Sequence, residues 1–495
     1  MTSFSQLTTP PNPVLTRRRD ASGRLVLLIV SAGFSLATLD LFIVNVALPK
    51  IAHDFGSAGL GDLSWVLNAY AIVFAALLVL FGRLADRFPR EYGFLLGVAV
   101  FTVGSALCAA ADSTLALVSF RVVQAAGAAL MTPTSLGMVL ATSSGKARDN
   151  NVRAWTAISG LMAALGPVVG GLLVALSWRW VFVVNIPFGA AVLVFGWMRL
   201  PHVRGERIPY PDAFGAVLLT AGVALLTLGL VKGDVWGWGS TQAIGVLVGS
   251  VAVIGSFVLH VLRSRNPLLD RDLFRRRSFT GASVIATLYS VAFGALLLSL
   301  VLWFQNVWHW SALHTGLAIA PGPLLVLPTA LLLTERLIGR FGPGLVIAIG
   351  ASLFAIGALW FAVFAGLKPD YGADILPGNA LLGVGVGLTL PTIVASATSE
   401  LPAQNFATGS AVVNMLRQVG LAIGVAILIA VLGTHNGPDA VLDAFEQSWL
   451  VIGALAAAAA LSSLAIVGVR RPTPHATTTG ATVPIDRRGA LAEDT

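Results

Sequence analysis

Long apolar stretches separated by short polar segments follow one another along almost the whole chain. About 20 apolar residues in a helix, at about 1.5 Å per residue, cross the hydrocarbon core of a bilayer. Fourteen runs are long enough to do so, at 25–48, 65–84, 93–111, 114–140, 152–176, 179–200, 213–231, 241–263, 279–304, 314–335, 344–366, 374–398, 408–433 and 449–469. The pattern therefore predicts an all-α polytopic membrane protein with 14 transmembrane helices.

Composition supports this class and narrows the chemistry. Of the 495 residues, 56% are hydrophobic and only 11% are charged, whereas an average soluble chain carries about 25% charged residues. The net charge of +8 does not indicate a nucleic-acid partner, because the basic residues lie between the apolar runs. The single cysteine, Cys108, excludes a disulfide framework and a Cys-rich metal site. We expect no metal, no cofactor and no ATP site.

The Lys and Arg residues fall on alternate sides of the predicted spans. If the N-terminus is inside, the outer segments hold only Lys50, Arg179, Lys232 and Lys368, and the inner segments hold all but two of the others. The positive-inside rule then places both termini in the cytoplasm and the protein in the cell membrane. The polar tails, residues 1–24 and 470–495, are predicted to be disordered.

A short basic pattern occurs twice and indicates an internal repeat. Residues 82–91 read GRLADRFPRE and residues 335–343 read ERLIGRFGP, so Arg, Leu, Arg and Phe recur in register. Either segment alone would only be a basic cytoplasmic loop. Together they predict a six-helix bundle at 25–200, an inserted helix pair with basic linkers at 201–278, and a second six-helix bundle at 279–469.

Three charged residues lie well inside predicted spans, away from their ends, and two of them match in depth. Asp40 lies about 12 Å below the outer end of the first span, and Arg121 about 10 Å below the outer end of the fourth. Burial favours the protonated form of a carboxylate and a neighbouring guanidinium favours the ionised form. If the two spans are neighbours, Asp40 and Arg121 can form a proton-coupling pair. The alternative is a structural carboxylate that only holds two helices together.

Several motifs surround these residues. The first span reads LDLFIVNVALP at 39–49, and the fourth carries Arg121, Gln124, Gly127 and Pro133. The segment after the second span has Gly82, Leu84, Ala85, Asp86, Arg87 and Arg90, with Pro89 where glycine is usual. The fifth span carries Gly166, Pro167, Gly170 and Gly171, and a Trp-rich stretch follows at 178–187. In these motifs the chain resembles the fourteen-span drug:proton antiporter family of the major facilitator superfamily.

The resemblance implies roles for these residues. It implies that Arg121 handles protons with Asp40. It implies that Gly82, Asp86, Arg87 and Arg90, with Arg336 and Arg340 of the second copy, form a conformational latch. It also implies that the glycine-proline motif of the fifth span is an exporter feature, although glycine pairs in membrane helices commonly serve only close packing.

The polar residues of the spans limit the substrate. The candidates for the central cavity are Asn45, Asn68, Gln124, Asn414, Arg417 and Gln418. No acidic residue other than Asp40 lies well inside a span, so we expect a lipophilic neutral, monocationic or weakly acidic compound rather than a dication. Arg417 can alternatively extend toward the inner surface and bind main-chain carbonyls.

These features predict proton-coupled efflux of lipophilic drugs or antibiotics by alternating access. The alternatives are an exporter of an endogenous or weakly acidic metabolite and a proton-coupled uptake symporter. An enzyme is disfavoured because the seven histidines show no H-E-x-x-H spacing. The expected partners are the bilayer, protons and a small lipophilic substrate, and we expect a monomer.

Overall fold

The computed structural model describes residues 23–56, 60–143, 145–203, 212–264, 267–399, 401, 406–433 and 437–466. These residues are almost entirely helical. The two predicted tails fall, apart from residues 23 and 24, outside the described residues.

The first half of the chain and the inserted pair contain nine helices in the described residues. They are α1 (Gly23–Asp54), α2 (Leu60–Arg87), α3 (Arg90–Ala109), α4 (Thr114–Ala141), α5 (Gly145–Leu176), α6 (Trp180–Val183), α7 (Asn185–Arg199), α8 (Ala213–Trp236) and α9 (Thr241–Arg263).

The second half is helical throughout its described residues and includes three π-helical turns. Its elements are α10 (Arg271–Phe274), α11 (Arg277–Leu302), η1 (Trp303–Val307), α12 (Ala312–Ile319), α13 (Pro321–Pro328), η2 (Thr329–Thr334), α14 (Glu335–Phe341), α15 (Pro343–Phe364), η3 (Tyr371–Ile375), α16 (Leu376–Thr398), α17 (Phe406–Leu432) and α18 (Pro438–Ile466).

The predicted all-α membrane architecture is confirmed. In the described part of the chain, thirteen helical spans are long and apolar enough to cross a membrane. The remaining predicted span belongs to α5, which is 32 residues long, begins with a polar segment and is apolar over Leu165–Leu176. The order of these helices follows the order of the fourteen apolar runs.

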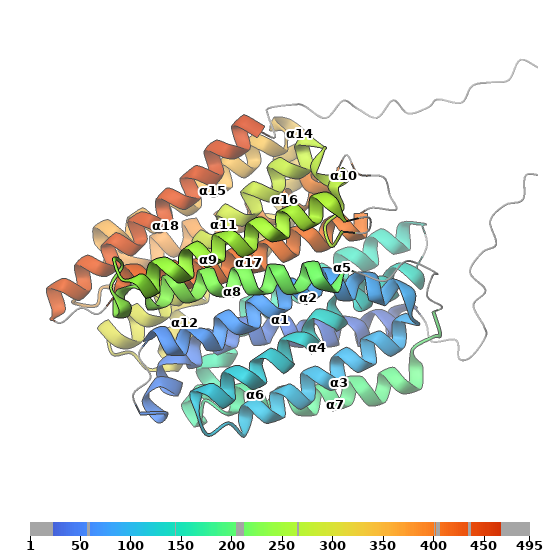
Figure 1. Cartoon of the computed structure of the whole chain (residues 1–495), viewed down its shortest axis with the longest axis horizontal. Helices are drawn as coiled ribbons and strands as arrows, with labels where there is room; N and C mark the ends of the chain where they lie inside the picture. The colour runs from blue at the N-terminus through green and yellow to red at the C-terminus, as the bar shows by residue number, and fades with distance from the viewer. Residues whose placement is uncertain are drawn as a thin grey trace, which may run out of the picture.

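The helices form two bundles with a helix pair at their junction. Figure 1 shows α1 to α7, in blue to blue-green, on one side and α11 onward, in yellow-green to red, on the other. Helices α8 and α9 pack on each other, and α8 contacts both α2 of the first bundle and α17 of the second. The inserted pair therefore covers the junction of the two bundles.

Paired glycines bring equivalent helices together in the two bundles. A β-carbon at Gly166 or Gly170 of α5 would lie 2.6 or 3.0 Å from the nearest atom of α1. A β-carbon at Gly420 or Gly424 of α17 would lie 2.7 or 2.1 Å from a carbonyl oxygen of α11. In each bundle, two glycines four residues apart lie on one helix face and allow close approach of the backbones.

The repeated basic segments are mostly helical rather than loops. Helix α2 continues to Arg87 because no residue breaks it before Pro89, and α14 covers Glu335 to Phe341. Pro89 precedes α3 with a φ of −56°, which suits its ring. The matching turn in the second copy is made by Gly342 with a φ of 81°. Proline at position 89 is therefore accommodated by a different turn geometry.

The two bundles contact each other at the end that carries Trp178, Trp308 and Trp310, which we call the tryptophan end. Here α5 packs against α12, and the Gln305 side-chain amide donates to the carbonyl oxygen of Val46 at 3.1 Å. The charge distribution of the sequence predicts that this end faces outward. The opposite end, which carries Arg87, Arg90 and Arg340, we call the arginine end.

Candidate functional site

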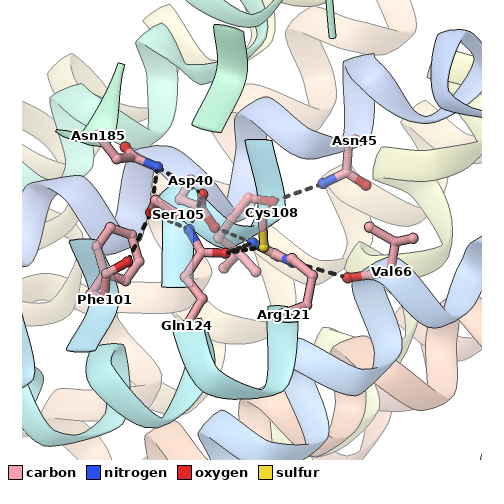
Figure 2. Close-up of polar contacts among 10 residues, drawn as sticks. Asp40, Asn45, Val66, Phe101, Ser105, Cys108, Arg121, Gln124 and Asn185 are labelled. Carbon is pink, nitrogen blue, oxygen red and sulfur yellow. Dashed lines mark hydrogen bonds and ion pairs between the residues drawn. The ribbon is translucent and has the colours of Figure 1, made fainter. Parts of the chain in front are cut away.

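A carboxylate and a guanidinium meet inside the first bundle. Arg121 Nη1 of α4 donates to Asp40 Oδ2 of α1, and both side chains are 0% exposed. Figure 2 shows the two residues facing each other between their helices. The depth argument from the sequence thus identified two residues that are in contact, and each compensates the cost of burying the other's charge.

Two further side chains complete the coordination of the Asp40 carboxylate. Gln124 Nε2 donates to Asp40 Oδ1 at 2.8 Å, and Asn185 Nδ2 donates to the same oxygen at 3.1 Å. Both donors also reach Ser105 Oγ of α3, at 2.8 and 3.3 Å (Figure 2). Three side-chain donors therefore converge on one buried carboxylate.

The Arg121 guanidinium is held from three directions. Its Nε donates to the carbonyl oxygen of Val66 on α2 at 3.1 Å, and Nη1 also donates to Gln124 Oε1 at 2.6 Å. The Tyr70 ring lies 4.1 Å from the guanidinium carbon, a cation–π geometry. Because these contacts do not involve Asp40, Arg121 has partners that remain when the carboxylate is neutral.

Helix periodicity explains why α4 supplies two of these groups. Arg121 and Gln124 are three residues apart and therefore lie on one face of α4, toward α1. Gln124 is fully buried in this network and does not line the described cavity. In this conformation Gln124 therefore belongs to the Asp40–Arg121 network, and its assignment as a cavity candidate stays a prediction.

Asn185 was not among the candidates from the sequence. It is the first residue of α7, directly after Val184, and it is 1% exposed. The sequence feature that could have identified Asn185 is a polar amide within an apolar run of the Trp-rich stretch. Nothing in that stretch alone indicates that its side chain reaches α1.

The equivalent position of the second bundle carries no such charge. Gly127 and Gly385 occupy matching contacts, α4 on α3 and α16 on α15, which places Asn379 where the first bundle has Arg121. The Asn379 amide donates to the carbonyl oxygens of Ala318 and Ile319, both at 3.2 Å. The packing of α4 on α3 is thus repeated by α16 on α15, but the neutral Asn379 takes the place of Arg121. Among the described residues, the buried ion pair belongs to the first bundle.

A small cavity lies between the bundles, away from the ion pair. Its volume is about 40 Å³, far below the roughly 300 Å³ of a typical ligand pocket. Its wall is formed by Leu41, Phe42, Asn45, Leu67, Asn68, Ala71, Gly294, Leu297, Leu421, Ala422 and Val425. A drug-sized molecule therefore requires the bundles to separate.

Two of the amide candidates do line this cavity. Asn45 Nδ2 donates to the Leu41 carbonyl of its own helix at 2.9 Å. Asn68 donates to Ser64 Oγ at 3.4 Å, while its buried Oδ1 has no partner. Asp40 is not part of the cavity wall although Leu41 is. In this conformation the Asp40 side chain is therefore closed off from the cavity.

The candidates on α17 lie together in the second bundle. Asn414 Nδ2 donates to the Ser410 carbonyl at 3.0 Å, and Arg417 Nη1 donates to Asn414 Oδ1 at 3.1 Å. Gln418 Oε1 is buried without a hydrogen-bond partner. In the described contacts the Arg417 guanidinium thus binds a side-chain amide, not a main-chain carbonyl.

The latch candidates of the first copy contact their own bundle. Arg90 Nη1 donates to the Gly137 carbonyl of α4 at 3.3 Å, and a β-carbon at Gly82 would lie 3.8 Å from Pro133 of the same helix. The Asp86 side chain lies outside the described residues. Its place in a latch, with Arg87, stays a prediction.

In the second copy, the Arg340 guanidinium carbon lies 5.3 Å from the centre of the Phe341 ring. Arg336 lies on the same short helix, α14. No ion pair between α14 and an acid occurs in the part of the chain that the structure describes. The latch role of Arg336 and Arg340 likewise stays a prediction.

The exporter motif contacts both bundles. Gly166 and Gly170 face α1 beside Phe42 and Ile43, two and three residues after Asp40. A β-carbon at Gly171 would instead lie 2.6 Å from the Ala312 carbonyl oxygen of α12. The motif therefore lies between the helix that carries the buried acid and the second bundle.

The chain matches a family model described as Major Facilitator Superfamily, over residues 30–425 and 283–488. It is 33% identical to the tetracenomycin C resistance and export protein of Streptomyces glaucescens, over 86% of this chain and 77% of that protein. It is 33% identical to the multidrug resistance protein B homolog of Mycobacterium tuberculosis, over 80% and 74%. It is 29% identical to the methylenomycin A resistance protein of Streptomyces coelicolor, over 94% and 96%.

Solved structures share the fold at low sequence identity. The human organic anion transporter MFSD10 has a TM-score of 0.60 and 16% identity, over 90% of this chain and 100% of that chain. A peptide transporter POT in complex with sulfate has a TM-score of 0.65 and 18% identity, over 89% and 94%.

Proposed function

The chain belongs to the Major Facilitator Superfamily, and we propose that it exports lipophilic drugs or antibiotics across the cytoplasmic membrane in exchange for protons. The three relatives reported above are named as drug or antibiotic resistance proteins, which supports an efflux transporter. Proton coupling and alternating access are inferred from the arrangement of the buried polar residues.

The observation that carries the proposal is the Asp40–Arg121 ion pair at 0% exposure inside a membrane helix bundle. A charge at such depth costs about 2.5 kcal/mol or more, and a purely structural contact between α1 and α4 could be made by apolar side chains. An acid retained there with three hydrogen-bond donors is suited to bind and release a proton.

Protonation acts first on the contact between Asp40 and Arg121. Protonation of the Asp40 carboxylate removes its negative charge and weakens its attraction to Arg121. Arg121 keeps Gln124 Oε1 and the Val66 carbonyl, so its own position changes little. The contact between α1 and α4 then loses its strongest component, and α1 becomes free to shift.

The path from this contact to the second bundle is short. Phe42 and Ile43 of α1 pack on Gly166 and Gly170 of α5, and Gly171 of α5 faces α12. A shift of α1 therefore acts on the helix that closes the tryptophan end. We infer that proton binding from outside accompanies substrate release, and that proton release to the cytoplasm accompanies the return, with the two bundles rocking about the central cavity.

The driving force is adequate for export without a cofactor. Each proton that enters contributes about 2.3 kcal/mol per 100 mV of membrane potential and about 1.4 kcal/mol per pH unit. We further propose that the protein acts as a monomer in the cell membrane with both termini in the cytoplasm. A latch at the arginine end completes the proposal.

Inverted membrane vesicles test it directly. An acidic lumen should drive uptake of a fluorescent lipophilic dye by vesicles with the wild-type protein. Asp40→Asn should abolish that uptake with the protein still present in the membrane. Asp272→Asn is the matched control, because Asp272 is exposed in a weak surface pair with Arg275.

The same assay separates the alternative directions. A proton-coupled uptake symporter would load inverted vesicles when the medium, not the lumen, is acidic. Undiminished uptake by the Asp40→Asn variant with an acidic lumen would contradict the proposed role of Asp40.

A further inference from the structure

Arg417 is a second cation within a membrane helix, and its environment differs from that of Arg121. In the described residues its only hydrogen bond is the one from Nη1 to Asn414 Oδ1, and its buried Nε has no partner. No described carboxylate forms an ion pair with it. The charge of Arg121 is balanced by Asp40, whereas no carboxylate in the described residues balances the charge of Arg417.

Other buried polar atoms lie near this guanidinium. Gln418 Oε1, on the next residue of α17, is buried without a hydrogen-bond partner. The Tyr289 hydroxyl of α11 is buried within electrostatic reach of Arg417, and its polar neighbour is Thr389 of α16. A folded protein rarely leaves several buried polar atoms unpaired, and their clustering marks a place that a polar ligand group can occupy.

The cluster is continuous with the cavity between the bundles. Arg417, Leu421 and Val425 are spaced four residues apart and lie along one face of α17. Leu421 and Val425 line the cavity. Arg417 therefore lies about 6 Å along the helix axis from the cavity wall, toward the arginine end.

The rest of the cavity suits an apolar molecule. Its wall is mostly aliphatic, with Phe42 from α1. Phe42 is also in edge contact with Phe293 of α11, at 6.4 Å between ring centres. An amphiphile that enters when the bundles separate could place its apolar body here and its polar group one helical turn away, at Arg417.

Resting on the proposed export function, we infer that Arg417 anchors an anionic group, so that the preferred substrates are lipophilic monoanions with one carboxylate or phenolate. A guanidinium offers parallel N–H donors that match a carboxylate, and Nε with one Nη is the usual pair. A cationic drug would be repelled at this position. Export of an anion in exchange for a proton also moves both charges in the direction favoured by an inside-negative membrane potential.

Three fluorescent probes with one apolar body test the inference: pyrenebutyrate, its neutral primary amide and the matching pyrenebutyl-trimethylammonium cation. Binding is measured to the purified full-length protein in nanodiscs at pH 8, by energy transfer from tryptophan to pyrene, with empty nanodiscs as the blank. Wild-type protein should bind the carboxylate at least about tenfold more tightly than the amide, and the cation most weakly.

Variants assign the preference to one side chain. Arg417→Gln should weaken carboxylate binding at least about tenfold and change amide binding less than about twofold. Arg417→Lys should retain part of the preference, because it keeps the charge but loses the paired donors. Arg275→Gln is the matched control, since Arg275 is 84% exposed, and it should change nothing.

Two results would overturn the inference: equal wild-type affinity for the three probes, or equal losses for all three in Arg417→Gln. Binding of the amide shows that a variant is folded. The proposed function fails separately, if acid-lumen vesicles show no Asp40-dependent uptake while the charge preference persists.

Discussion

Gly171 of α5 and Ala312 of α12 lie in direct backbone contact across the boundary between the two bundles. A β-carbon at position 171 would stand 2.6 Å from the Ala312 carbonyl oxygen and 2.7 Å from the Cα atom of Leu313. Only glycine fits there without displacement of a backbone. The contact therefore places one residue of the exporter motif against the backbone of the second bundle at the tryptophan end.

Gly171→Ala should disfavour this closed state. Overpacking costs about 1–3 kcal/mol, and because the neighbours are backbone atoms, we expect export to fall by roughly fivefold or more. Dye efflux from cells with equal amounts of protein measures the effect. Gly160→Ala is the control on the same helix, since a β-carbon there meets nothing within 4 Å; equal efflux of the two variants would show that the contact is not limiting.

Asn185→Leu should impair proton-driven transport. Asn185 Nδ2 donates to Asp40 Oδ1 and to Ser105 Oγ, and a leucine leaves the carboxylate without one of its three side-chain donors. A hydrogen bond to a charged group contributes about 1.5–3 kcal/mol, so we expect dye uptake driven by an acidic lumen to fall by roughly tenfold or more.

Asn45→Leu is the control for this loss, because Asn45 Nδ2 donates to the main chain of its own helix. It should alter the affinity for substrate and leave the maximal uptake in place. Unchanged maximal uptake in Asn185→Leu, or the same fall in both variants, would contradict the assignment of Asn185 to the proton site.

Gly342→Ala should destabilise the turn before α15. Gly342 has a φ of 81°, a conformation that costs an alanine about 1 kcal/mol or more. Gly339→Ala lies three residues earlier inside α14, where a β-carbon meets nothing, and should be neutral or stabilising by about 0.5–1 kcal/mol. Thermal unfolding of the purified variants, followed by intrinsic fluorescence, should separate the two; a higher midpoint for Gly342→Ala would be the contrary result.

The pattern of apolar residues was sufficient to predict the helices, and charges within that pattern predicted one long-range contact, Asp40 with Arg121. Apolar runs set the number and order of the helices because the bilayer fixes their length. Asp40 and Arg121 could be paired because charges are rare in membrane helices and their depths could be compared.

Contacts that depend on helix rotation could not be obtained in this way. Asn185 at the start of α7 reaches Asp40 of α1, and Gln124 of α4 donates to the same carboxylate. Hydrophobicity alone does not orient a helix that is apolar on all sides. The different turns at Pro89 and Gly342 likewise depend on local backbone angles.

The most direct test of the account is proton movement caused by substrate. Purified protein is reconstituted into liposomes with a pH-sensitive dye inside and an imposed pH gradient, and a transported dye is then added. Wild-type protein should move protons down their gradient only when substrate is present. Asp40→Asn should bind substrate and move no protons. Substrate-dependent proton movement that persists in Asp40→Asn would contradict the central claim that this buried carboxylate carries the proton.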